Sequence, residues 1–431
     1  MKKLPISVKS ILDLRTIENI MNDYYEQNHM TAEQEVAATK SDVIDLDRCK
    51  RTYNKDFDGT TFYPNYYGCM TGVILEKLKH ERHTSLEPSF FTLGSGKFMI
   101  SYGFVNGEGL HNKLQYRELP ADMITDRINI FDELGTREVV RSFPTLEDGL
   151  AYCHEHLAMN ELVMIAGTTY YLNYTPDYML PEQVWRDRLS THTDSFIDVS
   201  NRGVGRAHSF LLVDILDEGY LVYDSTFSYY GLLSVEDFNR SFAGLKNMKF
   251  LDGIYAQNTN RPYTISEYDM SHITWIDNKA IGLRVLKNTI DINTCDRYED
   301  VNSNGYNFSF FYGVRAYKEI ANILIEYRDT KEALLDLRNL ICSCFGSYQY
   351  KFMFFRDFLI DLSKYVTIPE EYLAYCHKFI RFCEATCKEA GMIDESQIPA
   401  YIDQVVPLLN GMYRDQKEYF KNLKHLLYQE S

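Results

Sequence analysis

The distribution of hydrophobic and polar positions divides the chain into three stretches. Residues 1–55 are polar and mixed, with short helical pieces and no clear fold of their own. From about 60 to 260, helical and strand-like patterns alternate, whereas beyond about 310 apolar residues recur every third or fourth position, as in amphipathic helices. The pattern predicts an N-terminal helical extension (1–55), an α/β domain of the α+β type (56–305) and an α-helical C-terminal domain (306–431).

The middle stretch contains a helix that begins near a cysteine. After the polar, aromatic segment 61–68, apolar residues at Val73, Ile74 and Leu78 fit one helical face, with charged residues on the other. Cys69 falls in the first turn, where the helix dipole and unpaired backbone N–H groups stabilise a thiolate. Cys69 is therefore either a nucleophile or one of nine ordinary thiols. The distinction depends on whether the rest of the chain supplies a partner.

Strands and capped helices follow along the chain. Residues 145–160 predict a helix with Thr145 as its N-cap, and 161–174 predict a buried strand that leads into a Tyr-rich bend. Two runs of β-branched and aromatic residues, 208–216 and 219–226, surround a short turn with Gly219 and predict a β-hairpin. A helix with Ser234 as N-cap and Asp237 three residues on is expected next.

Composition narrows the function classes. With 431 residues, of which 45% are hydrophobic, the chain can form two or three domains with real cores. The formal net charge of −16 argues against nucleic-acid binding, which needs a basic surface, and it suits a cationic small molecule. The 34 tyrosines and 25 phenylalanines make aromatic-lined pockets plausible, although packing accounts for most of them.

The cysteine pattern and the termini indicate the compartment. Nine cysteines occur without a CxxC pair or zinc-finger spacing, so we expect no metal site, and the pair Cys383 and Cys387 is expected to pack inside the helical domain. The basic N-terminus lacks the apolar core of a signal peptide, and no run is long enough to cross a membrane. The expectation is a cytoplasmic, soluble protein with reduced thiols, no bound cofactor and no membrane partner.

The hairpin supplies the partner that Cys69 needs. His208 opens its first strand and Asp224 lies near the end of the second, so both are expected at one edge of the sheet. In thiol catalysis the thiolate attacks a carbonyl, the imidazole moves the proton and the carboxylate fixes the imidazole tautomer. The order Cys, His, Asp is the one that papain-like folds use, and it resembles the bacteriocin-processing double-glycine peptidases and their relatives.

A wider resemblance covers roughly residues 60 to 360, in patches. The segment "GCMTGVILEKLKHERHTSLEPSFFTLGSGKFMISY" is similar to the N-terminal domain of the butirosin biosynthesis protein H family, in which a cysteine helix precedes an acidic residue (Glu87 here), a glycine turn and an aromatic strand. The segments "YYLNYTPDY" and "HSFLLVDILDEGYLVYDSTFSYYGLLSVEDF" resemble that family's Tyr-rich segment and its His and Asp strands. "FRDFL" at 355–359 is compatible with its appended helical domain.

This resemblance implies a papain-like acyltransferase in natural-product assembly, such as antibiotic or nonribosomal peptide biosynthesis. The acyl group would come from the phosphopantetheine thioester of an acyl or peptidyl carrier protein and form an amide on a small-molecule amine. Cys69 would be the nucleophile, His208 the general base and acid, and Asp224 the orienting acid. Tyr63 stands where papain has its oxyanion-hole glutamine, and Gly68 where relatives often have histidine, so Asn65 is the predicted oxyanion donor beside the Cys69 N–H.

Two other functions stay open at this point. The same triad would serve a hydrolase or peptidase, and a non-catalytic module that docks a carrier protein would have an unreactive Cys69. Two further patterns predict no site: "TLGSGK" lacks the spacing of a phosphate loop, and "HEH" at 154–156 lacks zincin spacing. The presumed lid at 178–206 carries Arg202 and Arg206, which are either part of a solvated loop or candidate contacts to a carrier.

Overall fold

The protein is described by a computed structural model. It describes residues 50–64, 67–95, 98–105, 114, 129–175, 178–179, 207–243, 263–303 and 306–430. Most of the predicted extension 1–55, the amide Asn65 and most of the presumed lid, including Arg202 and Arg206, therefore lie outside the described residues.

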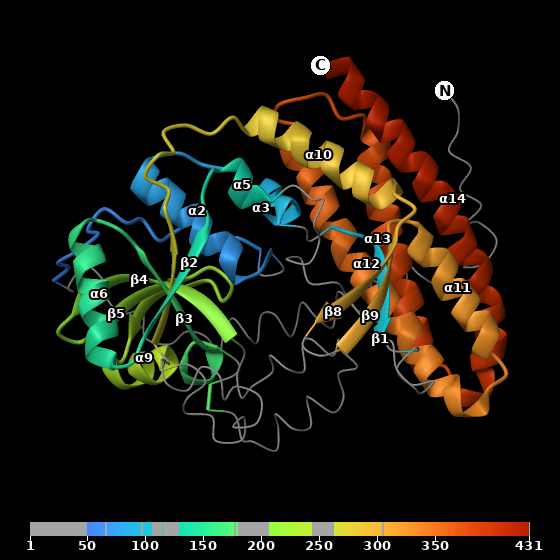
Figure 1. Cartoon of the computed structure of the whole chain (residues 1–431), viewed down its shortest axis with the longest axis horizontal. Coiled ribbons are helices and arrows are strands. Elements are labelled where there is room, and N and C mark those ends of the chain that lie inside the picture. Colours follow the sequence, from blue (N-terminus) through green and yellow to red (C-terminus); the bar gives the residue numbers. More distant parts are fainter. Residues whose placement is uncertain are drawn as a thin grey trace.

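A six-stranded antiparallel sheet forms the centre of the N-terminal part (Figure 1). Its strands lie in the order β2, β7, β3, β4, β5, β6. Strands β3 to β6 follow one another along the chain, whereas β7 returns from far downstream to lie between β2 and β3. The strands are β2 (Glu138–Phe143), β3 (Val163–Thr168), β4 (Ala207–Leu216), β5 (Gly219–Asp224), β6 (Tyr229–Leu233) and β7 (Tyr263–Tyr268).

Helices cover both faces of this sheet. On β4, Leu211 and Val213 belong to the same hydrophobic core as the apolar side of α2 (Cys69–Arg82), whereas Phe210 and Leu212 pack with α6 (Leu146–Ala158) and α9 (Val235–Phe242). This alternation follows from the two-residue period of a strand. Figure 1 accordingly places α2 above the sheet and α6 and α9 at its other side.

The local predictions for this part are confirmed. Thr145 caps α6 by accepting a hydrogen bond from the Asp148 N–H at 3.1 Å. Ser234 caps α9 in the same way, with the Asp237 N–H 3.1 Å from its hydroxyl oxygen. The hairpin β4–β5 also forms, and its register shifts between Leu212 and Asp214, as at a β-bulge.

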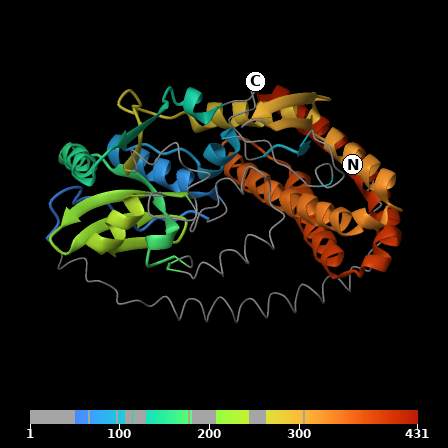
Figure 2. The same ribbon diagram turned by 60° about the horizontal axis from the view of Figure 1, so that its bottom comes forward.

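The C-terminal part is mainly helical (Figure 2). Helix α12 packs along α13, while α14 runs beside α10 and α11. A three-stranded sheet in the order β1, β9, β8 lies against this group, with α11 packed on β1 and β9. The elements of the whole chain that have not yet been given bounds are α3 (Pro88–Gly94), β1 (Ser101–Val105), α5 (Ile130–Glu133), η4 (Thr169–Tyr171), α10 (Asn278–Thr294), β8 (Tyr298–Ser303), β9 (Tyr306–Tyr312), α11 (Arg315–Tyr327), η7 (Lys331–Ala333), α12 (Leu334–Leu362), α13 (Glu370–Met392), η8 (Glu395–Gln397) and α14 (Ile398–Glu430).

The fold class is therefore mixed α+β, with antiparallel sheets in the N-terminal part and a long helical C-terminal region. The pairing of β1 with β9 joins strands from the two sides of the predicted domain boundary at residue 306. Helix α10, which precedes that boundary, packs on α14 and contacts α12. Among the described residues, no helix is both long and apolar enough to cross a membrane.

Candidate active site at the N-terminus of α2

Helix α2 begins at Cys69, as the sequence predicts. Gly68 precedes it with φ 85° and ψ 163°, a left-handed φ that side-chain-bearing residues rarely adopt. The backbone therefore explains why glycine stands at this position. Because the first N–H groups of a helix have no partner within it, the half-buried thiol lies where backbone donors and the helix dipole favour negative charge.

His208 and Asp224 meet at the end of the hairpin. The Nε2 atom of His208 lies 2.6 Å from Oδ2 of Asp224, and the two residues are only 7% and 1% exposed. A contact this short in a buried place is typical of a charge-assisted hydrogen bond. The two residues that the sequence predicted at one sheet edge are thus a bonded pair.

Cys69 completes the set. His208 and the backbone N–H of Ser209 lie close enough to the Cys69 sulfur to favour its charged form and lower the pKa of the thiol. Since Nε2 of His208 is engaged with Asp224, Nδ1 is the ring nitrogen left for the thiol. The structure therefore brings all three predicted residues together as a Cys–His–Asp chain.

The electrostatics of the chain favour an ion pair. Burial by itself raises the pKa of the Cys69 thiol, but the hydrogen bond and the charge of His208 outweigh it and lower that pKa below its ordinary value. Burial likewise opposes the charged form of His208, yet the charge and hydrogen bond of Asp224 raise the pKa of this imidazole to about 10. The pair is thus shifted toward a thiolate beside an imidazolium, because each charge stabilises the other.

Asp224 is held by groups that the sequence did not single out. The hydroxyl of Tyr174 donates to its Oδ2 at 3.1 Å, and the N–H of Thr226 donates to its Oδ1 at 3.0 Å. The Tyr174 ring stacks on Tyr229 with centroids 3.8 Å apart. Because both donors hold the carboxylate in a fixed position, Asp224 can orient the His208 ring. The Tyr-rich bend after β3 was the only sequence signal for Tyr174.

The loop before Cys69 is fastened to the helical region. The hydroxyl of Tyr67 donates to Asp357 on α12 at 3.1 Å, and its ring lies 6.2 Å from that of Phe354. The backbone carbonyl of Tyr67 accepts a hydrogen bond from the Thr71 hydroxyl at 3.0 Å. Helix α12 therefore helps to position the start of α2, although it lies almost 300 residues downstream in the chain.

Helix α2 also approaches β5 closely. A Cβ atom on Gly72 would lie 2.3 Å from Cβ of Ser225, so glycine is needed for the contact. Ser225 directly follows Asp224 in the chain, and its hydroxyl oxygen accepts a hydrogen bond from the Tyr63 N–H at 2.9 Å. This contact fixes the distance between the helix that carries the thiol and the strand that carries the acid.

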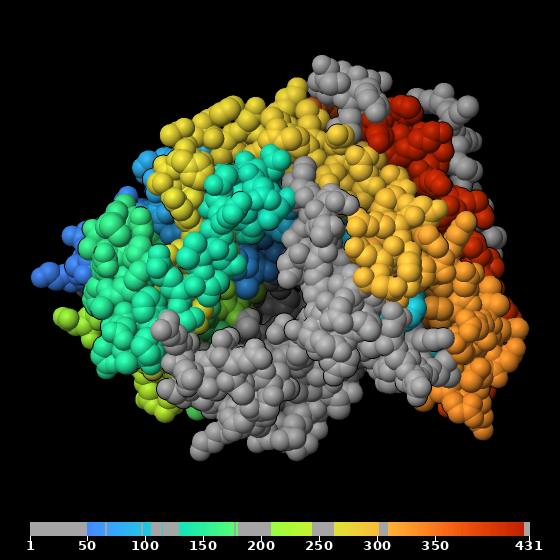
Figure 3. All heavy atoms as spheres, viewed as in Figure 1, coloured from blue at the N-terminus to red at the C-terminus, as the bar shows by residue number. Residues whose placement is uncertain are grey.

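A cavity of about 630 Å³ opens beside the thiol. Figure 3 shows blue atoms of this part of the chain set back beside the teal surface of α5 and β2. Aromatic rings and the thioether of Met70 form the apolar part of its wall, and polar groups of α2, of α3 and of the segment 129–138 form the rest. Its lining among the described residues includes Cys69, Met70, Phe91, Phe131, Asp132, Arg137 and Glu138.

The oxyanion donor is only partly defined. The side chain of Tyr63 is committed elsewhere, because its hydroxyl donates to Glu76 at 2.8 Å, so it does not replace the papain glutamine. The predicted donor Asn65 lies outside the described residues. The backbone N–H of Cys69, in the first turn of α2, is the predicted donor that the structure describes.

Tyr268 on β7 is a site neighbour that the sequence did not reveal. It is 5% exposed, and its ring stacks on Phe131 of the cavity wall with centroids 4.9 Å apart. Its hydroxyl lies near the Glu138 carboxylate without reaching the geometry of a hydrogen bond. Burial, Glu138 and Cys69 together raise the pKa of this hydroxyl, which keeps it protonated as a donor. No short-range pattern links β7 to Cys69.

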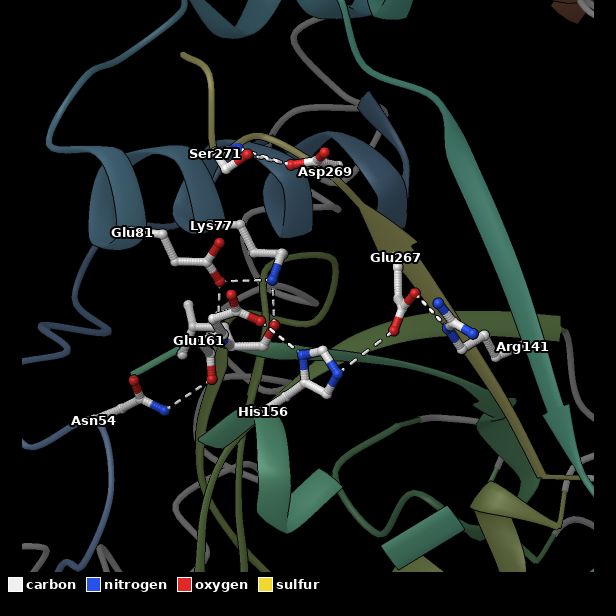
Figure 4. A network of polar contacts seen from close by, with 10 residues as sticks. Asn54, Lys77, Glu81, Arg141, His156, Glu161, Glu267, Asp269 and Ser271 are labelled. Carbon is white, nitrogen blue, oxygen red and sulfur yellow. Dashed lines mark hydrogen bonds and ion pairs between the residues drawn. The ribbon is translucent and has the colours of Figure 1, made fainter. Parts of the chain in front are cut away.

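A second, smaller cavity of about 280 Å³ lies at the other end of α2. Figure 4 shows its polar network, in which Nδ1 of His156 lies 2.7 Å from Glu161 and Nε2 lies 3.8 Å from Glu267. Lys77 and Glu81 of α2 form an ion pair of 2.6 Å in the same network. Since these charges largely pair with one another, the cluster joins α2 to the sheet.

The remaining sequence candidates lie away from the thiol or outside the described residues. His154 contacts the hydroxyl of Tyr53 at 3.2 Å rather than sharing a ligand with His156. Glu87 accepts a hydrogen bond from Tyr365 at 2.7 Å and forms an ion pair with Lys364 at 2.8 Å, so it anchors α3 to the region after α12. Within the described ranges, no three His, Cys, Asp or Glu side chains gather as metal ligands.

Comparison with known proteins does not assign the chain to a family. No protein-family model matches the chain, and no curated protein matches its sequence.

Proposed function

We propose that the protein is a cysteine-dependent acyltransferase with a papain-like catalytic core. It moves an acyl group from a carrier-protein thioester to an amine through an acyl-Cys69 intermediate. The observation that carries this proposal is the bonded chain of Cys69, His208 and Asp224, with the pKa of the thiol lowered and that of the imidazole raised. A cysteine helix packed on an antiparallel sheet that carries the histidine and the acid supports the papain-like assignment.

The first half-reaction needs little help with the leaving group. The Cys69 thiolate attacks the thioester carbonyl, and the negative oxygen forms near the N–H groups at the start of α2. The C–S bond to the pantetheine arm then breaks, and its sulfur takes the proton from the His208 imidazolium. One thioester replaces another, so the step is close to isoenergetic.

The second half-reaction forms the amide. An amine attacks the acyl-Cys69 carbonyl while neutral His208 accepts its proton. The C–S bond to Cys69 breaks, and the thiolate–imidazolium pair is restored. Asp224, held by Tyr174 and Thr226, keeps the same ring nitrogen directed at the site through both steps.

The cavity supports a substrate of moderate size. Its volume of about 630 Å³ lies within the usual range of ligand pockets, about 300–1,000 Å³. Phe91, Phe131 and Met70 suit the acyl chain or the pantetheine arm. Arg137, an exposed cation on the rim, suits the phosphate of that arm, while Asp132 and Glu138 suit a cationic amine. The phosphopantetheine stays attached to the carrier protein, so the arm enters as substrate.

A hydrolase or peptidase with the same three residues is the alternative, because water can replace the amine. A non-catalytic carrier-binding module is less consistent with the site. Such a module has no need for a thiol, an imidazole and a carboxylate in contact, with the acid held by further donors.

Intact-protein mass spectrometry tests the proposal. The protein and its Cys69→Ala variant would be incubated with acyl-pantetheine thioesters of several chain lengths. Acyl transfer predicts an adduct that depends on Cys69, persists in buffer and clears with an amide product when an amine is added. Clearance by water alone would indicate the hydrolase. No adduct with any donor would contradict both catalytic functions.

A further inference from the structure

Two cysteines of the helical region face each other across α12 and α13, the neighbouring helices in Figure 1. The Sγ atom of Cys342 lies 3.6 Å from the backbone carbonyl oxygen of Cys387, and Sγ of Cys387 lies 3.3 Å from that of Cys342. Each thiol also shifts the pKa of the other. Each side chain therefore reaches the backbone of the other residue, which places both sulfurs in the narrow space between the helices.

This pair differs from its neighbours in access. Cys344, Cys376 and Cys383 are fully buried, whereas Cys342 and Cys387 are partly exposed. A small oxidant can reach the pair more readily than the three buried thiols. The expectation that Cys383 and Cys387 both pack inside the bundle thus holds fully for Cys383 and only partly for Cys387.

The surroundings favour a negative charge on one sulfur. The hydrogen bond from Cys342 is the largest influence on Cys387 and outweighs burial, so the pKa of Cys387 is lowered to about 7, while that of Cys342 is raised. The backbone N–H of Gly346 on α12 acts in the same direction on the pKa of Cys387. A Cβ atom at Gly346 would lie 3.8 Å from this sulfur. The two adjacent thiols thus differ in acidity, which gives a nucleophile and a resolving partner.

We propose that Cys342 and Cys387 are an oxidative modification site at which a hydroperoxide converts the two thiols into a reversible disulfide between α12 and α13. The Cys387 thiolate attacks the terminal oxygen of the hydroperoxide, the O–O bond breaks, and a sulfenic acid forms as water or an alcohol leaves. The Cys342 sulfur then attacks the sulfenic sulfur, and hydroxide leaves and takes the Cys342 proton as water. Two thiols are oxidised and one peroxide is reduced.

The site is independent of the proposed acyltransferase function. Cys69 opens α2 beside the six-stranded sheet, whereas the pair joins two helices of the C-terminal region. The test therefore uses the full chain carrying Cys69→Ala, which removes the competing nucleophile. A failure of either idea leaves the other untouched.

The experiment treats this protein with hydrogen peroxide, alkylates the remaining thiols and measures the intact mass and the non-reduced peptide map. The expected result is the loss of two hydrogen atoms, a cross-linked peptide containing Cys342 and Cys387, and full reversal by dithiothreitol. Both sites should lose their reactivity toward the alkylating reagent together.

Matched variants identify the pair. Cys342→Ser and Cys387→Ser should each abolish the cross-link, whereas Cys383→Ser, which changes a buried thiol one turn away, should leave it intact. A cross-link to a different cysteine, stable over-oxidation of Cys387 while Cys342 stays reduced, or no reaction at either thiol in the folded protein would overturn the proposal.

Discussion

The thiols at the start of α2 and in the hydrophobic interior share a residue type and differ in chemistry. Cys153 on α6 and Cys376 on α13 are fully buried, and burial raises the pKa of each to about 12. Burial acts on Cys69 in the same direction, yet the pKa of Cys69 is lowered. The comparison shows that the partner decides the outcome, because His208 supplies a charge and a hydrogen bond to the sulfur.

The charge of His208 in turn depends on its contact with Asp224. The imidazolium of His208 is itself buried, and it keeps its proton because Asp224 lies 2.6 Å away. The carboxylate therefore stabilises the imidazolium, and the imidazolium in turn stabilises the thiolate. Each link can be broken separately, and the expected losses decrease with distance from the reacting sulfur.

Removing the ring should have the largest effect. His208→Ala takes away both the charge that lowers the pKa of Cys69 and the proton carrier, so we expect acylation of Cys69 to slow by about 10³-fold or more. Single-turnover acylation followed by mass spectrometry measures this rate. His154→Ala on α6 is the matched control and should react like the parent protein. An unchanged rate in His208→Ala would rule out the proposed triad.

Neutralising the acid should cost somewhat less. Asp224→Asn keeps the shape of the side chain but removes the charge that holds the His208 proton and orients the ring, so we expect a loss of roughly 10²–10³-fold in kcat. The partly exposed Asp237→Asn, which also neutralises a carboxylate that contacts a tyrosine hydroxyl, is the control. A loss confined to KM would instead place Asp224 in substrate binding.

The pH dependence of alkylation directly tests the difference in pKa between Cys69 and a buried thiol such as Cys153. Cys69 should ionise below the ordinary thiol range and react with iodoacetamide about 10²-fold faster at pH 7 than Cys153, whose pKa is raised to about 12. Because the pKa of His208 is raised to about 10, its proton is present below that pH and is lost as pH rises through it. Acyl transfer, which uses this proton, should therefore decline above about pH 10.

The control for this profile is the His208→Ala variant. Its Cys69 profile should move to higher pH, toward that of a buried thiol, because the imidazole no longer offsets the effect of burial on the pKa of the sulfur. Peptide mapping assigns each alkylated thiol. A Cys69 profile that stays in place without the imidazole would show that the helix terminus alone lowers its pKa.

The smallest effect should come from the group behind the acid. Tyr174→Phe removes one hydrogen bond to Asp224 but keeps the ring stacked on Tyr229, so a fall in kcat of about fivefold is expected, equivalent to about 1 kcal/mol. Tyr178→Phe, which loses a hydroxyl contact with Asp237, is the matched control. Equal effects of both variants would show that the Tyr174 hydroxyl does not position Asp224.

Interactions over short sequence distances could be predicted from the chain. The caps Thr145 and Ser234 depend on a residue three positions away, and the β4–β5 hairpin depends on a turn of a few residues. The hairpin also brings His208 and Asp224 close, because antiparallel strands joined by a tight turn have their far ends together. For this reason two members of the site could be predicted as neighbours.

Contacts between distant segments could not be predicted in this way. The placement of β7 between β2 and β3, of Tyr67 against Asp357, and of Cys342 against Cys387 depends on how separate elements pack. Glu87 shows the opposite case, because it fits a sequence motif but binds Tyr365 and Lys364 away from the thiol. Packing is set by the shapes of whole faces, which a local pattern does not contain.

The sequence by itself determined that a cysteine would open a helix and that a histidine and an acid would share a sheet edge, because helix caps and hairpins are local. The tertiary structure alone decided that α2 lies close enough to β4 and β5 for the three groups to touch. That approach requires the bare Cα of Gly72 against Ser225 and the contact of Tyr67 with α12. The pKa of Cys69 depends on distances between side chains, and only the folded chain sets them.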